Sequence, residues 1–303
     1  MELAQLNRFQ DFMDRIHIPP DAQTEFYRAE TQLHTSVSDA SQLAQIKSEF
    51  DLGQIGFKEA IAKLKALSDP AGISEFTLYF YFLILCSDVL HGKYRTRGID
   101  DQIFWDTMDD LRCKLLECYE VKGVWGTFVV DWYEGFLTME RFALGRFQYE
   151  EKAFEGEPFT KHSVTVNPKD IVYNFHIPSS GQPIDRAVRY DSYRKAYEFY
   201  GCKQKGKPLV LVCDSWLLSA ENEKFLPPDS NILAFIRDFD MISNRSYDTF
   251  SDSWRVFGKH HTLPVEQLPV DTKLRKSVVQ HLLNGGKMGY GYGLIIFDGE
   301  KII

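Results

Sequence analysis

The chain lacks the sequence features of several large functional classes. Its five cysteines form no Cys-x-x-Cys pair and no zinc-ligand spacing with the eight histidines, so the sequence predicts no metal site. The first residues have no basic segment followed by an apolar core, so no signal peptide is predicted. The most apolar stretch, residues 76–90, is shorter than the roughly 20 residues that span a bilayer. Together these absences, with an odd number of cysteines, favour a cytoplasmic protein with no membrane partner.

Charge is also absent where a nucleic-acid-binding protein would need it. Residues 1–145 contain 14 Lys and Arg against 23 Asp and Glu, whereas residues 146–303 contain 21 against 20. The acidic first half would repel a phosphate backbone, so the sequence predicts no nucleic-acid partner. The nearly neutral second half has enough basic residues to hold a phosphorylated cofactor.

What the first half does contain is helical periodicity. Apolar residues recur three and four positions apart from Phe57 to Leu67, and an aromatic run follows from Phe76. Such a run is apolar on most sides of a helix, so this helix is expected to be central. Gly123 is a predicted helix end, and Trp125 to about Leu144 is predicted to form a further helix. The pattern indicates a helical N-terminal domain over residues 1–145.

The pattern changes at Gly145. Alternating or apolar runs predict strands near residues 146–151, 170–177, 208–213, 241–246, 253–257 and 290–297. Between them, residues 191–200 are predicted to form a helix with Asp191 as its N-cap. The predicted fold class is therefore α+β, with an all-helical N-terminal domain followed by a mixed α/β domain over residues 146–303.

The most informative segment is Leu209–Leu218, Leu-Val-Leu-Val-Cys-Asp-Ser-Trp-Leu-Leu. Its apolar residues predict a buried strand that carries Asp214 and Ser215 at its carboxyl end, where open α/β sheets bind ligands. The alternative is that Asp214 or Ser215 caps a short helix beginning near Trp216. Cys213 ends an apolar strand, a position typical of a buried and unreactive thiol.

Trp216 and the turn at Pro227–Asn231 are predicted to be structural. Asp229 or Ser230 is expected to cap a helix that carries apolar side chains into the core.

Three segments carry a resemblance to a known family. They are Cys213–Leu218 with Leu226–Leu233 (Leu-Pro-Pro-Asp-Ser-Asn-Ile-Leu), Phe142–Glu150 (Phe-Ala-Leu-Gly-Arg-Phe-Gln-Tyr-Glu) and Val172–Gly181 (Val-Tyr-Asn-Phe-His-Ile-Pro-Ser-Ser-Gly). They resemble a bacterial family of acyltransferase-domain proteins, in which a helical N-terminal domain precedes a C-terminal domain similar to the GNAT-type acyl-CoA N-acyltransferases. The resemblance implies a GNAT-like fold for residues 146–303. It also implies acyl transfer from acetyl-CoA or another acyl-CoA to an amine acceptor that the sequence does not identify.

An acyltransferase of this kind needs a base, a donor that stabilises the tetrahedral oxyanion or protonates the leaving thiolate, and a site that binds the CoA pyrophosphate. His176 follows a predicted strand and is the candidate base, with Glu150 as an alternative; Asp214 and Ser215 are expected to line the acceptor side. Candidates for binding the cofactor phosphates are residues of the turn after His176 and two nearby cations: Ser179, Ser180, Gly181, Arg186 and Arg189.

One part of the superfamily pattern is missing. The usual phosphate-binding motif is a Gln/Arg-x-x-Gly-x-Gly/Ala turn directly before a helix, and residues 178–190 do not contain it. The sequence therefore leaves a second hypothesis open: a non-catalytic binding or assembly protein that keeps the GNAT-like fold.

Overall fold

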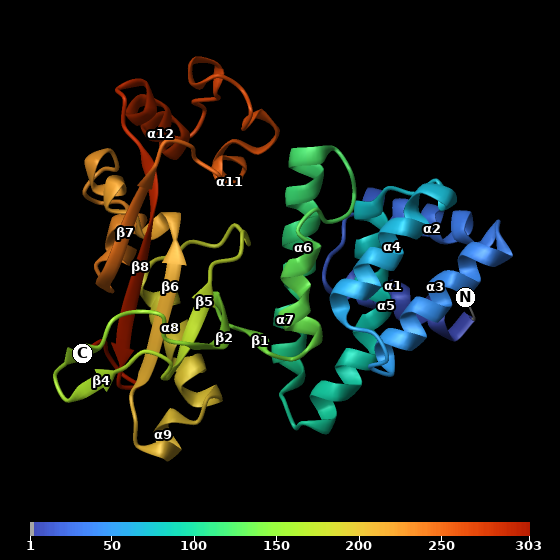
Figure 1. Cartoon of the computed structure of the whole chain (residues 1–303), viewed down its shortest axis with the longest axis horizontal. Helices are drawn as coiled ribbons and strands as arrows, with labels where there is room; N and C mark the ends of the chain where they lie inside the picture. The colour runs from blue at the N-terminus through green and yellow to red at the C-terminus, as the bar shows by residue number, and fades with distance from the viewer. Residues whose placement is uncertain (1–2) are drawn as a thin grey trace. The chain divides into compact units, whose positions relative to one another are not determined.

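The computed structural model describes residues 3–303, and the chain divides into two compact units (Figure 1). The first ends at Glu140 and the second begins at Arg141. The first unit is helical and the second contains two β-sheets with helices, so the predicted α+β fold class is confirmed. The long helices of the first unit are α1 (Leu3–Arg15), α2 (Pro20–His34), α3 (Val37–Asp51), α4 (Phe57–Ala71), α5 (Glu75–Thr96) and α6 (Asp101–Lys122).

Helix α5 is the centre of the helical unit. Its side chains are buried on nearly every side, as the aromatic run predicted, and Phe80 stacks on Phe26 of α2 with ring centroids 5.0 Å apart. The ends of neighbouring helices follow their sequences. Ser36 caps α3 by accepting a hydrogen bond from the Asp39 amide. Gly123 ends α6 at φ 68°, a left-handed conformation that glycine adopts without steric cost, so the predicted stop is confirmed.

The predicted helix from Trp125 to Leu144 is wrong. The chain forms only the short turn η1 (Val130–Tyr133) and helix α7 (Glu134–Leu137) before the first strand begins at Arg141. The reason is a close backbone contact near Gly126. The Thr127 amide donates to the Phe76 carbonyl at 3.0 Å, and the Thr77 hydroxyl donates to the Trp125 carbonyl at 2.8 Å. These tertiary bonds hold residues 125–129 outside a helix, and the apolar side chains of this segment are only half-buried.

The second unit is built on a six-stranded mixed sheet of order β1-β2-β5-β6-β8-β7. Only β5 and β6 are parallel; the other neighbours are antiparallel. A separate hairpin, β3 (Phe159–Lys161) and β4 (Val164–Val166), pairs with itself. The strands of the main sheet are β1 (Arg141–Leu144), β2 (Phe147–Ala153), β5 (Ile171–His176), β6 (Leu209–Ser215), β7 (Asp240–Tyr247) and β8 (Met288–Phe297).

Helix α8 (Arg186–Phe199) makes the crossover between the parallel strands β5 and β6 (Figure 1). Its predicted N-cap is wrong: Asp185, not Asp191, caps the helix by accepting from the Val188 amide at 3.1 Å. The N-cap therefore lies six residues earlier than predicted. Tyr193 of α8 packs on Phe147 and Phe175, which fixes the helix on one face of the sheet.

Short helices complete the second unit. Ser230 caps α10 (Asn231–Ile236) by accepting from the Ile232 amide, which confirms the predicted turn. Trp216 is 9% exposed within an apolar cluster, so its structural role is also confirmed. The predicted strand at 253–257 is wrong, because these residues form helix α11. The remaining elements are α9 (Cys202–Lys205), η2 (Trp216–Leu218), η3 (Ala220–Lys224), α11 (Ser253–Phe257), η4 (Gly258–His260), η5 (Val265–Gln267) and α12 (Lys273–Leu283).

Gly126 provides a direct test of the backbone contact that prevents the expected helix. A Cβ at this position would lie 2.3 Å from the Phe76 carbonyl carbon, so Gly126→Ala requires the backbone to move. We expect a loss of about 1–3 kcal/mol of unfolding free energy, measured by urea denaturation. The control is Gly92→Ala in α5, where an added Cβ meets nothing within 4 Å, and a small gain is expected. Equal effects of the two substitutions would contradict this account.

Candidate active site

The two parallel strands separate at their carboxyl ends. The pairing of β5 with β6 covers only Tyr173 with Leu211 and Asn174 with Val212. Beyond it, His176 pairs only toward β2, and the end of β6 at Ser215 pairs only toward β8. The sheet therefore loses its central hydrogen bonds at the edge where ligands bind to α/β sheets.

His176, the predicted base, is held by a carboxylate at this edge. Its Nε2 lies 2.8 Å from Glu150 Oε1 on the neighbouring strand β2. Arg141 of β1 donates to Glu150 Oε2 from Nε at 2.9 Å, and the Asn174 amide nitrogen lies 2.9 Å from Oε1. The strand register explains this grouping, because Arg141 faces Glu150 and Glu150 faces Asn174 across adjacent strands.

The charge of Glu150 is stabilised by these contacts. Burial alone would raise the pKa of Glu150, but the hydrogen bond and charge of His176, the charge of Arg141 and the hydrogen bond from Asn174 lower it to about 2. An ionised carboxylate accepts hydrogen bonds, so its contact with His176 is made by an N–H at Nε2, and the Asn174 amide nitrogen also lies 3.0 Å from this Nε2. The arrangement can orient a base and stabilise the imidazolium ion that forms when the base takes a proton.

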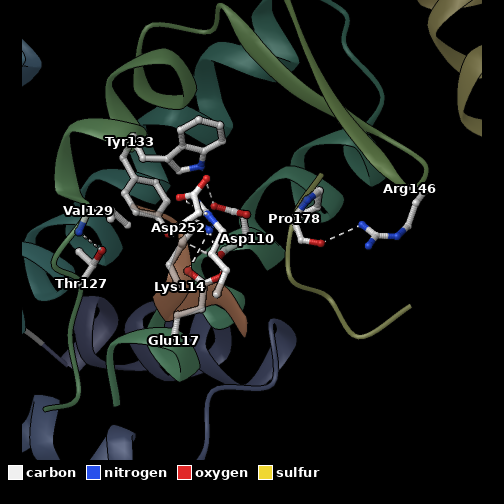
Figure 2. Close-up of polar contacts among 11 residues, drawn as sticks. Asp110, Lys114, Glu117, Thr127, Val129, Tyr133, Arg146, Pro178 and Asp252 are labelled. Carbon is white, nitrogen blue, oxygen red and sulfur yellow. Dashed lines mark hydrogen bonds and ion pairs between the residues drawn. The ribbon is translucent and has the colours of Figure 1, made fainter. Parts of the chain in front are cut away.

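The turn after β5 is organised by Arg146. This side chain is 7% exposed, and its Nη1 donates to the Pro178 carbonyl at 2.9 Å (Figure 2). Its Nε donates to the carbonyls of Gln182 at 3.2 Å and Pro183 at 3.3 Å. One guanidinium therefore connects the beginning and the end of the turn that contains the predicted phosphate-binding residues.

Those predicted residues occupy different environments. Ser179 and Gly181 are exposed, and Gly181 has φ 77°, while the half-buried Ser180 accepts from the Gln182 amide through its hydroxyl. Arg186 is exposed in the first turn of α8 and lies over the Tyr190 ring.

Arg189 has a different role. It is 2% exposed, and its guanidinium binds both carboxylate oxygens of Asp238, at 2.6 and 3.1 Å. Further bonds go to the carbonyls of Ile184 at 2.7 Å and Ala234 at 3.2 Å. Because its donors bind these core groups, we assign Arg189 a structural role, joining α8 to the segment around α10, and leave it out of the proposed site.

Asp214 and Ser215 lie on opposite faces of the sheet, because successive strand residues alternate. The register of Asn174 with Val212 places Asp214 on the same face as His176. Asp214 forms an exposed ion pair with Arg245 of β7, with oxygens 2.5 and 2.7 Å from Nη2. The Ser215 hydroxyl accepts from the Leu217 amide at 3.2 Å and caps η2, as the helix-cap alternative predicted. The structure therefore does not bring His176 and Ser215 together on one face.

Cysteines and possible metal ligands are the other groups within residues 3–303 that could carry chemistry. All five cysteines are buried and form no disulfide, and burial raises the pKa of the Cys213 thiol, as expected for an unreactive group. No cluster of three or more His, Cys, Asp or Glu side chains in this range is placed to hold a metal ion. Among the described helices, none has the length and apolar character that crossing a membrane demands.

Sequence reasoning left Arg141 and Arg146 without roles. Arg146 stands inside the Leu-Gly-Arg-Phe-Gln segment, where an arginine between a glycine turn and an apolar strand was an available signal. Arg141 could not be recognised, because it was expected in a helix rather than in β1 opposite Glu150.

The fold and family comparisons agree on the class of protein. Residues 142–295 match the model of the GNAT-like C-terminal domain, and residues 7–139 match the N-acyltransferase N-terminal domain. The chain thus has the two-domain architecture of a GNAT-like acyltransferase, and it belongs to the family defined by the GNAT-like C-terminal domain. No curated protein sequence is significantly similar to this one.

Solved structures share the fold at low identity. An acyltransferase variant in complex with octanoyl-CoA is 17% identical, with a TM-score of 0.72 over 95% of this chain and 87% of that one. An acyltransferase in complex with decanoyl-CoA is 20% identical, with a TM-score of 0.65 over 95% and 99%. An acyltransferase in complex with decanoyl-CoA and teicoplanin is 21% identical, with a TM-score of 0.63 over 74% and 68%. At these identities the likeness concerns the fold.

The low pKa of Glu150 predicts a pH dependence of stability. A carboxyl whose folded pKa is about 2, against an ordinary 4.5, stabilises the fold above pH 4.5 and loses that contribution as the pH falls toward 2. We expect wild type to exceed Glu150→Gln by about 3 kcal/mol of unfolding free energy at pH 6, with the gap closing by pH 2. Urea denaturation across this range measures it. The exposed neighbour Glu151→Gln is the control, and a gap of constant size would count against the assignment.

Proposed function

We propose that this protein transfers an acyl group from an acyl-CoA to an amine. The observation that carries the proposal is the His176–Glu150 pair, held at the edge where β5 and β6 separate. Family membership and the fold it shares with acyltransferases that were crystallised with acyl-CoA support the choice of co-substrate. The acceptor is an amine of unidentified structure.

His176 supplies the base in this mechanism. The amine nitrogen attacks the thioester carbonyl, a C–N bond forms, the C–S bond breaks, and CoA leaves as its thiolate. The imidazole of His176 accepts the proton that the attacking amine loses, and this proton can then neutralise the thiolate. Glu150 remains ionised because its pKa is about 2, so it stabilises the imidazolium ion without taking the proton itself.

The turn between β5 and α8 is the proposed phosphate site. Ser179, Ser180 and Gly181 offer hydroxyl and amide groups, and Arg186 adds a positive charge at the start of α8. The first amides of a helix lack intrahelical partners and favour an anion. Asp185 already accepts a hydrogen bond from one of these amides, that of Val188, so the turn has to supply part of the phosphate binding. Arg146 would set the shape of this turn through its three carbonyl contacts.

Asp214 belongs to the proposed acceptor side because it shares the face of His176. Its ion pair with Arg245 is exposed, so an incoming ammonium group could compete for the carboxylate at little cost.

A binding or assembly protein is the second candidate. Two observations favour it: the missing Gln/Arg-x-x-Gly-x-Gly/Ala turn and the negative charge of Asp185 at the helix cap where the pyrophosphate would lie. Binding of CoA without turnover of any acyl-CoA and amine would support this alternative.

Acyl-CoA binding tests the phosphate site. We expect decanoyl-CoA or acetyl-CoA to raise the melting temperature, with a stabilisation of about 2.7 kcal/mol at 100 times the dissociation constant. Arg146→Lys keeps the charge but loses the forked contact with the turn, so we expect weaker binding by about tenfold. Arg194→Lys, an exposed residue of α8, is the matched control. No shift with either CoA ester in wild type would refute the proposed co-substrate.

Removing the base tests the mechanism. We expect His176→Ala to lower kcat for thiol release from acyl-CoA in the presence of an amine panel by about 10²–10⁴-fold. His260→Ala, which replaces an exposed histidine, should leave kcat unchanged. A kcat for His176→Ala within a factor of about two of wild type would exclude the general-base role.

A further inference from the structure

The helical unit contains a cavity that the acyl-transfer site does not use. It has a volume of about 590 Å³ and lies among α1, α2, α3 and α5. This volume is within the range of small-molecule sites, and most of the lining is apolar, as in such sites. The apolar part of the lining includes Leu33, Leu43, Ile84, Leu85 and Val89.

Exposed apolar side chains also belong to this lining. Leu52 is 68% exposed and Val89 is 37% exposed, and both line the cavity. Exposed apolar side chains beside a hollow are typical of ligand-binding surfaces, because a ligand that covers them removes apolar area from water. The buried and the exposed parts of the lining therefore favour the same kind of ligand body.

Four of the charged side chains in the lining form two ion pairs. Arg8 Nη1 of α1 lies 2.9 Å from Asp88 Oδ2 of α5, and Lys47 pairs with Asp51 one turn further along α3. Each pair joins one cation to one carboxylate. Neither pair therefore offers an unmatched charge to a ligand.

The carboxylate of Glu30 has partners within the protein as well. Glu30 lies on α2 and is 8% exposed. The Tyr81 hydroxyl donates to its Oε2, and His34 Nε2 lies 3.6 Å from its Oε1. Both carboxylate oxygens are thus contacted, as a buried charge requires. Every charged side chain that the structure describes in this lining is matched inside the helical unit.

We propose that this cavity binds a small uncharged molecule with an apolar body, of the size of a medium-chain alcohol. An ammonium or carboxylate group would lose hydration in the cavity without meeting an unmatched charge of opposite sign. An uncharged molecule loses little hydration and removes both its own apolar surface and that of the lining from water. The inference is independent of the acyl-transfer proposal, because it concerns residues of the helical unit alone.

Three probes of equal chain length test the preference for an uncharged ligand. Isothermal titration calorimetry of the whole chain with 1-octanol, octylammonium chloride and sodium octanoate separates apolar contact from charge. We expect saturable binding of octanol, with both ions binding about tenfold more weakly or less. Either ion binding as tightly as octanol, or no saturable binding of octanol, would overturn the proposal.

A substitution on α3 tests whether octanol binds in this cavity. Ala44 is exposed and lines the cavity, so the phenyl ring of Ala44→Phe should fill part of the space without disturbing the core. We expect the affinity for octanol to fall by about tenfold. Ser41→Phe places the same ring at an exposed position of the same helix outside the lining, and it is the matched control.

A second substitution changes only the exposed part of the lining. Leu52→Asp removes apolar contact at a surface position, and we expect about threefold weaker octanol binding. Val37→Asp is its control, because Val37 is 84% exposed on α3 and lies outside the lining. Unchanged octanol affinity in Ala44→Phe, or a Leu52→Asp effect no larger than that of Val37→Asp, would refute the assignment.

Discussion

The two-residue parallel pairing between β5 and β6 is the constraint on which the second unit depends. It is long enough to align the strands and short enough to leave their carboxyl ends without mutual hydrogen bonds. Each end is instead supported from outside, His176 by β2 and Ser215 by β8. Antiparallel partners on both sides thus support β5 and β6 where these two strands separate. The proposed active site lies at that separation.

Buried ions keep this arrangement in place. Arg189 and Asp238 connect the crossover helix α8 to the segment after α10. Arg146 connects the two ends of the turn after β5. Arg141 and Glu150 form a second ion pair beside His176. Each buried charge has a counter-charge or backbone carbonyls, as the cost of desolvation requires. The difference among them is exposure: the Glu150 group reaches the proposed reaction edge, while Arg189 is enclosed.

The helical unit also contains a buried polar contact, between Tyr81 and Glu30. Its central helix α5 is apolar on nearly all sides, yet it directs Tyr81 toward the buried carboxylate of Glu30. A fully apolar helix would pack without this cost. The stacked Phe26 and Phe80 rings, by contrast, lie fully within the apolar core of this unit.

The sequence by itself determined the fold class, the positions of most helices and strands, and His176 as the strand-end base candidate. Period-3.6 and period-2 patterns are local, and the family segments are contiguous, so both can be read from the chain alone. Tertiary structure decided the rest. A backbone contact with Phe76 replaced the expected helix after Trp125, and strand register set Arg141 opposite Glu150 while turning Ser215 away from His176. Such pairings join residues of different elements, and the periodic pattern within one element does not encode which residues of another will face it.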